Sequence, residues 1–223
     1  MKCEKLAGLQ PEGVFACFEK LCSIPHGSGN IEAISNYLKE FAESHGVRVI
    51  QDPVGDILWF QPATPGYEDH APVLLQGHMD MVCEKDPDCT LDMAKDPLDL
   101  THDDQFVFAR GTTLGGDDGI AVAYAMALLE DPTIPHPPIE VLITVDEETG
   151  MTGAENIDMS QFSAMRLINL DSEDEGIFTV SCAGGASVLT KLPAKRKAVY
   201  GPCIRLTVEG LRGGHSGVEI NEN

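Results

Sequence analysis

The stretch from Gly119 to Gly150, GIAVAYAMALLEDPTIPHPPIEVLITVDEETG, decides the fold class. Its first part, residues 119–129, is rich in small apolar residues and predicts a helix. After a proline-rich turn, the β-branched run at residues 139–145 predicts a strand. A helix followed closely by a largely apolar strand is typical of a sheet covered by helices. This strand then ends in three consecutive acidic residues.

The same alternation of helices and strands continues on both sides of this stretch. Upstream, apolar residues at helical spacing predict a helix over residues 11–23, and a second helix that Asn30 caps and Gly46 ends. Short apolar runs predict four strands, at residues 47–51, 57–60, 72–76 and 165–170. We therefore expect an α/β fold whose functional residues lie beyond the carboxyl ends of the strands.

Composition and charge exclude several classes of protein. The 223 residues carry 36 Asp and Glu against 15 Lys and Arg, and the formal charge of −21 argues against nucleic acid or an anionic membrane as a partner. The longest apolar run, residues 120–129, is far shorter than the ~20 residues that span a bilayer. The N-terminus has no apolar signal core, so we expect a cytoplasmic protein. Seven cysteines without a Cys-x-x-Cys pair are expected to be reduced and buried.

The acidic residues are unevenly distributed. Residues 111–190 contain fourteen Asp and Glu but a single base, Arg166. Such a segment repels itself unless solvent, protons or a bound cation neutralise it. A solvated acidic face is the simpler explanation of a charge-rich segment, and the positions of the acids favour a cation instead.

The first candidate site follows the predicted strand at residues 72–76. The sequence GHMD spaces His78 and Asp80 so that both side chains point to one side of an extended chain. One of them can then bind a metal while the other supports it. Alone, a His-x-Asp triplet is weak evidence, because histidines beside aspartates are common on protein surfaces.

The second candidate is a glycine-rich loop, GTTLGGDDG, which leads into the helix predicted at residues 119–129. A phosphate-binding loop is the rival interpretation, but no Lys-Ser/Thr follows, and Asp117 and Asp118 would repel a phosphate at a helix N-terminus. A role as helix cap explains one aspartate well and the pair less well. A bound cation is therefore favoured.

Two further strand ends are acidic. Glu147 and Glu148 follow the strand at residues 139–145 and point to opposite sides, so that one can bind a metal while the other faces the cleft as a base. Asp171 directly follows the run at residues 165–170. One histidine and three or four carboxylates form an oxygen-rich site that suits Zn²⁺, Mn²⁺ or Co²⁺.

This ordered set of motifs resembles the M20 co-catalytic metallopeptidases, and most of all their cytosolic aminoacyl-histidine dipeptidase (peptidase D) branch. The matching segments are GHMDMV, GTTLGGDDGIA, TVDEETGMTGA, LINLDSE and GGHSG, and the resemblance spans essentially the whole chain. The resemblance implies a zinc-exopeptidase-like catalytic domain over residues 1–184, with a mixed, mostly parallel sheet. It also implies that residues 185–223 begin an α+β lid or dimerisation domain.

The resemblance further implies a role for each candidate residue. Two divalent cations, zinc first and manganese or cobalt as alternatives, would be held by His78, Asp117, Glu148 and Asp171. Asp117 would bridge the two cations and precede a cis peptide bond. Asp80 would orient His78. Glu147 would be the general base that takes a proton from a metal-held water, which then attacks the carbonyl of a dipeptide.

His215, in the motif GGHSG after a strand-like run at residues 203–210, would bind substrate from the lid domain, which would also form a homodimer. Without the resemblance, a turn histidine among glycines is the favoured interpretation. Members of the family are longer and carry a final metal-binding histidine downstream, so we expect this chain to be an N-terminal part. Two alternatives stay open: an inactive metal-binding or association fragment, and another exopeptidase or deacylase of the superfamily, such as a tripeptidase.

Overall fold

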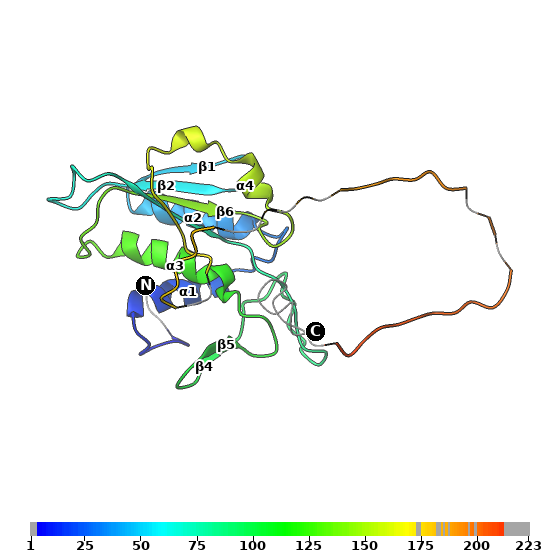
Figure 1. Ribbon diagram of the computed structural model, residues 1–223. Helices are drawn as coiled ribbons and strands as arrows, with labels where there is room; N and C mark the ends of the chain where they lie inside the picture. The colour runs from blue at the N-terminus through cyan, green and yellow to red at the C-terminus, as the bar shows by residue number, and fades with distance from the viewer. Residues whose placement is uncertain are drawn as a thin grey trace. The chain divides into compact units, whose positions relative to one another are not determined.

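The computed structural model describes residues 4–172, 175–181, 184, 186, 188–195, 197–198 and 200–211. The chain divides into two units, Met1–Thr179 and Val180–Asn223. Among the described residues, all helices and strands belong to the first unit (Figure 1).

A five-stranded sheet forms the centre of the first unit. Its strands, in spatial order, are β1 (Arg48–Gln51), β2 (Ile57–Gln61), β6 (Ile139–Thr144), β3 (Val73–His78) and β7 (Leu167–Asn169). Strand β2 pairs antiparallel with both β1 and β6, whereas β3 pairs parallel with both β6 and β7. Four strands therefore run in one direction and only β2 runs in the other. The expected mixed, mostly parallel sheet is confirmed.

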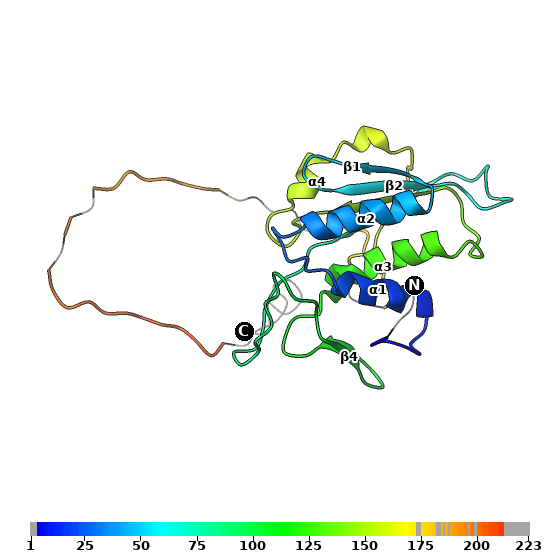
Figure 2. The same ribbon diagram turned by 180° about the vertical axis from the view of Figure 1, so that it is seen from behind.

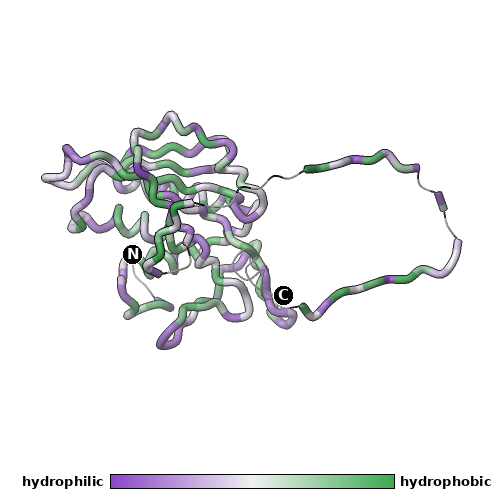
Figure 3. Tube along the Cα trace, viewed as in Figure 1, coloured by the Kyte–Doolittle hydropathy of each residue, from purple (hydrophilic) through white to green (hydrophobic). Residues whose placement is uncertain are grey.

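Three helices share one hydrophobic core with one face of this sheet (Figure 2). They are α1 (Glu12–Cys22), α2 (Glu32–Ser44) and α3 (Gly116–Glu130). The odd-numbered residues of β6 enter this core, whereas Leu142 packs with Leu58 and Leu74 in a smaller cluster. Successive strand residues point to opposite faces, so a strand buried on both faces is apolar nearly throughout. Figure 3 shows the apolar residues running along α3 and the strands. Among the described residues, we find no helix long and apolar enough to cross a bilayer.

Several short elements were not predicted. They are the hairpin of β4 (Leu100–His102) and β5 (Val107–Ala109), helix α4 (Thr152–Asn156) and the 3-10 helix η1 (Met159–Gln161). Each has only three to five residues, and unlike the equally short β1, β2 and β7, the elements β4, α4 and η1 do not lie in an apolar run that marks them in the sequence.

The structure corrects the predicted start of two helices. The prediction that Asn30 caps the second helix is wrong: α2 begins at Glu32 without a side-chain cap, and the Asn30 amide donates to the Ala94 carbonyl instead, at 3.2 Å. Helix α3 includes Asp117 and Asp118, both with non-helical backbone angles. The peptide bond between them is cis, as the family resemblance implied.

The described cysteines are free but not all buried. Cys17 and Cys22 lie in the core, and burial raises the pKa of each thiol to about 12. Cys83 and Cys203 are exposed, so the expectation of buried thiols is wrong for them. Composition indicates that these thiols are unpaired, but only the fold determines which of them meet solvent.

The described residues of the second unit form neither a helix nor a strand. The strand-like run at residues 203–210 is therefore not a strand in this structure, and Ile204 and Leu206 are 95% and 89% exposed. A strand needs a neighbour for its backbone hydrogen bonds, and in the described part of this unit no strand offers one. His215 lies outside the described residues.

Candidate metal centre

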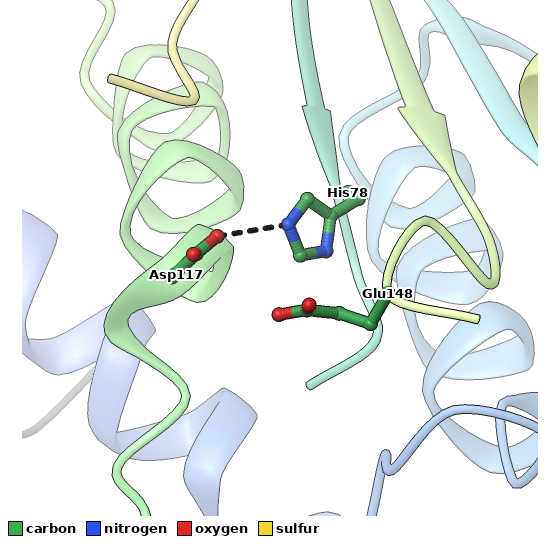
Figure 4. Close-up of side chains that lie close together, drawn as sticks. All are labelled: His78, Asp117 and Glu148. Carbon is green, nitrogen blue, oxygen red and sulfur yellow. Dashed lines mark hydrogen bonds and ion pairs between the residues drawn. The ribbon is translucent and has the colours of Figure 1, made fainter. Parts of the chain in front are cut away.

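The predicted site residues converge beyond the carboxyl ends of the central strands. In the parallel pair of β3 and β6, His78 lies opposite Thr144, so the two strands end at the same edge of the sheet. His78 is the last residue of β3, and Glu147 and Glu148 follow β6. Asp171 follows β7 at the same edge, and Asp117 comes from the first turn of α3. Figure 4 shows His78, Asp117 and Glu148 close together.

His78 is almost completely buried, at 1% exposed, and its two ring nitrogens have different surroundings. Nδ1 lies 2.8 Å from the backbone oxygen of Asp80. A carbonyl oxygen only accepts hydrogen bonds, so Nδ1 carries the hydrogen. Nε2 faces two carboxylates, 2.9 Å from Asp117 Oδ1 and 4.0 Å from Asp171 Oδ2. Neutral His78 therefore presents the lone pair of Nε2 to the carboxylates, as a metal ligand must.

The charge state of His78 depends on these carboxylates. Burial alone lowers the pKa of the imidazole, but hydrogen bonds to Asp117 and Asp80 outweigh burial and raise it to about 11. The contact between Nε2 and the Asp117 carboxylate thus favours a proton on Nε2. A divalent cation would take the place of this proton, because imidazole must be deprotonated to ligate.

Asp80 connects His78 to the loop that carries the paired glutamates. Its buried carboxylate accepts hydrogen bonds from the Ser28 hydroxyl at 2.7 Å and from the backbone N–H of Glu147 at 3.0 Å. Burial tends to raise the pKa of Asp80, but bonds from His78, Ser28 and this N–H hold it below its usual value. Asp80 is therefore charged and fixed in place, and it holds the end of β3 against the loop after β6.

Two groups of side chains have the geometry to hold a cation. The first is His78, Asp117 and Glu148, and the second is His78, Asp118 and Asp171; within each, one potential ligand atom per residue lies within 4.8 Å of the others. The structure thus brings together all four predicted ligands, His78, Asp117, Glu148 and Asp171. Their donor atoms, one imidazole nitrogen and several carboxylate oxygens, fit Zn²⁺ and similar divalent ions.

Asp118 is a member of these groups that was not predicted as a ligand. It is 2% exposed, and its Oδ2 accepts a hydrogen bond from the backbone N–H of His78 at 3.3 Å. Burial raises the pKa of Asp118 to about 7; the charge of His78 opposes this rise and that of Asp171 adds to it. The signal for Asp118 was present in the sequence, because a helix cap explains only one aspartate of the GGDDG pair.

Glu147 and Glu148 differ in their relation to the two groups of potential ligands. Glu148 belongs to the first group of potential ligands, whereas Glu147 belongs to neither. Both are half-buried, and burial together with neighbouring carboxylates raises the pKa of each above its usual value. The two consecutive carboxylates thus occupy different positions at one site.

The loop that carries these glutamates is fixed by residues that sequence reasoning missed. Asp56 is fully buried and accepts a hydrogen bond from the backbone N–H of Val145 at 2.9 Å, just where β6 ends. The N–H of Gly29 donates to Asp146 Oδ1 at 2.7 Å. These contacts join segments about 90 and 117 residues apart in the chain, so no local pattern could indicate them.

Both sequence and structure resemble known peptidases. The model of Peptidase family M20/M25/M40 matches residues 74–194. The cytosol non-specific dipeptidase of Escherichia coli (strain K12) is 44% identical over 219 residues, which make up 97% of this chain and 45% of that protein.

Two solved structures share the fold over most of this chain. The aminoacylhistidine dipeptidase from Vibrio alginolyticus is 43% identical with a TM-score of 0.75, covering 78% of this chain and 35% of that one. Aminopeptidase PepT from Bacillus cereus ATCC 10987 is 25% identical with a TM-score of 0.60, covering 73% and 44%. This chain thus spans less than half the length of each of these relatives. Because the family model matches more than half of its residues, the chain belongs to Peptidase family M20/M25/M40.

Proposed function

We propose that this chain provides the metal-binding part of a dinuclear metallodipeptidase that hydrolyses aminoacyl-histidine or, more broadly, Xaa-Xaa dipeptides. The observation that carries the proposal is the convergence of His78 with two sets of carboxylates at one sheet edge. The names of the relatives support the substrate class, because one is a non-specific dipeptidase and another an aminoacylhistidine dipeptidase.

In this proposal His78, Asp117 and Asp171 would hold one divalent cation and Asp117 and Glu148 would hold the other. Zinc is the first candidate, with manganese and cobalt as alternatives. The geometry of His78 supports this assignment, because Nδ1 is occupied by Asp80 and Nε2 faces the carboxylates. When bound, the cations supply Lewis-acid chemistry: they lower the pKa of a coordinated water and polarise a peptide carbonyl.

Glu147 is the proposed general base. It lies outside both groups of potential ligands, so its carboxylate stays available for proton transfer. Its raised pKa, caused first by burial, brings the group closer to the range in which a base both accepts a proton and returns it. Glu147 would take a proton from the attacking water and donate it to the departing amine.

The remaining proposals concern the whole protein. Residues 1–184 would belong to the catalytic domain and residues 185–223 would begin the lid, from which His215 would bind substrate and through which a homodimer would form. A cytoplasmic location is supported by the name of the Escherichia coli relative, a cytosol dipeptidase. The family resemblance supports these assignments.

The proposed function is tested with the protein expressed from its complete gene. Metal content is measured by elemental mass spectrometry, and hydrolysis of β-alanyl-histidine, leucyl-glycine and a tripeptide is followed with and without Zn²⁺ or Mn²⁺. We expect two metals per chain and turnover of dipeptides. Faster turnover of the tripeptide would favour the tripeptidase alternative, and the absence of metal and turnover would favour an inactive association module.

Ser28→Ala should weaken metal binding by about 10- to 100-fold, because it removes a hydrogen bond that fixes the carboxylate beside the His78 imidazole. Competition with a chromophoric chelator measures the affinity. Ser44→Ala is the matched control, because its hydroxyl donates to the Phe41 carbonyl at the end of α2. Equal affinities of the two variants would show that Ser28 does not position the ligand.

A further inference from the structure

A pocket of about 460 Å³ opens beside the proposed metal centre. Glu148 and Thr149 form one wall, and the others come from residues 27, 28 and 30, 81–84 and 93–94. One side of the pocket thus belongs to the loop that carries the proposed ligand Glu148. A substrate whose peptide bond lies at the metal centre could therefore place one of its side chains here.

The walls of this pocket are mainly apolar and adaptable. They include Met81, which is 3% exposed, together with Met93, Val82, Cys83 and Ala94. Methionine is unbranched and polarisable, and methionine-lined surfaces accept side chains of different shapes. Such walls suit an uncharged apolar side chain without demanding one particular shape.

The charges around the pocket indicate which end of a dipeptide lies there. Its lining includes Glu84 and Glu148 and, in the described part of the chain, neither lysine nor arginine. The two nearby lysines are engaged elsewhere: Lys85 donates to the Leu91 carbonyl and Lys95 to the Asp92 carboxylate, both at 2.7 Å. Glu148 is a proposed metal ligand, so Glu84 is the acid of this lining that attracts an α-ammonium group and repels an α-carboxylate.

We propose that this pocket, the Met81/Met93 pocket, receives the side chain of the N-terminal residue of a dipeptide and selects for uncharged apolar side chains. The inference rests on the proposed function, because it places the scissile peptide bond at the metal centre. It adds a preference that the metal ligands themselves do not determine. Residues of many shapes are accepted N-terminal to the scissile bond, provided that their side chains are apolar.

Ala94→Trp tests the pocket. Ala94 is exposed in the pocket wall, and its hydrogen bond with Asn30 involves its backbone oxygen and not its side chain. In the protein expressed from its complete gene, we expect kcat/KM for leucyl-glycine to fall about tenfold or more, because the added ring excludes the leucine side chain. Glycyl-leucine should change less than twofold. Ala71→Trp, on the exposed segment before β3, is the matched control and should leave both values unchanged.

Labelling of Cys83 gives a second measurement that does not depend on turnover. In Glu147→Gln, which should bind dipeptides without cleaving them, leucyl-glycine should slow the reaction of Cys83 with N-ethylmaleimide at least fivefold, and glycyl-leucine should not. The exposed Cys203 is the internal control, read from the same peptide mass spectra.

The two measurements separate the pocket from the proposed function. Equal losses for leucyl-glycine and glycyl-leucine in Ala94→Trp, or Cys83 labelling that leucyl-glycine does not slow, would overturn the pocket assignment. If Cys83 is protected as expected but the wild-type protein cleaves neither dipeptide, the pocket stands and the proposed hydrolysis fails.

Discussion

Replacing Glu147 with glutamine should lower kcat by about 10²- to 10⁴-fold and leave the metal content of the protein unchanged. Glutamine has the size of glutamate but cannot accept a proton at neutral pH, so the variant loses general-base catalysis. Metal binding should survive because Glu147 belongs to neither group of potential ligands. Steady-state kinetics with a dipeptide and elemental mass spectrometry measure the two effects on one sample.

Glu155→Gln is the control for this prediction, since it makes the same chemical change on the exposed surface of α4. It should keep both activity and metal. If Glu147→Gln instead loses a metal, then Glu147 is a ligand and the roles of the two glutamates are exchanged. If it keeps wild-type activity, another residue serves as the base.

Asp117→Asn should abolish binding of both cations. The Asp117 carboxylate lies 2.9 Å from His78 Nε2 and belongs to the group of potential ligands that contains Glu148. In the proposed assignment it would also hold the cation of His78 and Asp171, so both cations would lose a ligand. An amide is a much weaker ligand for a divalent cation than a carboxylate. Ligands that bind only the folded state add about 2.7 kcal/mol at a hundredfold excess over Kd. Zn²⁺ should therefore raise the thermal midpoint of the wild-type protein and not that of the variant.

Asp104→Asn removes the same charge from an exposed position and should retain the response to Zn²⁺. Scanning calorimetry with and without Zn²⁺, together with elemental analysis, compares the three proteins. Two metals per chain in Asp117→Asn would contradict the bridging role. One retained metal would show that Asp117 serves a single position.

Much of the fold could be predicted because its main elements have strong local signals. Strand β6 is buried along its whole length and is therefore mostly apolar and β-branched in sequence, and the sequence of α3 is that of a helix of small apolar residues. The hairpin of β4 and β5 and the true start of α2 could not be predicted. For α2, asparagine is a residue type that commonly caps helices. The Asn30 side chain instead donates its hydrogen bond to Ala94, which lies 64 residues away in the chain.

The sequence by itself determined which groups meet at the site. His78 ends β3, and Glu148 and Asp171 come shortly after β6 and β7. Strands that run in one direction bring their carboxyl ends to one edge, so the alternation of elements and the spacing of these residues indicate that they lie together. Only the tertiary structure decided how they are held and what surrounds them. The bond from Ser28 to Asp80 and the Met81/Met93 pocket both arise from segments distant in the chain. Local periodicity reports the face on which a side chain lies, whereas contacts across the fold depend on how whole elements pack.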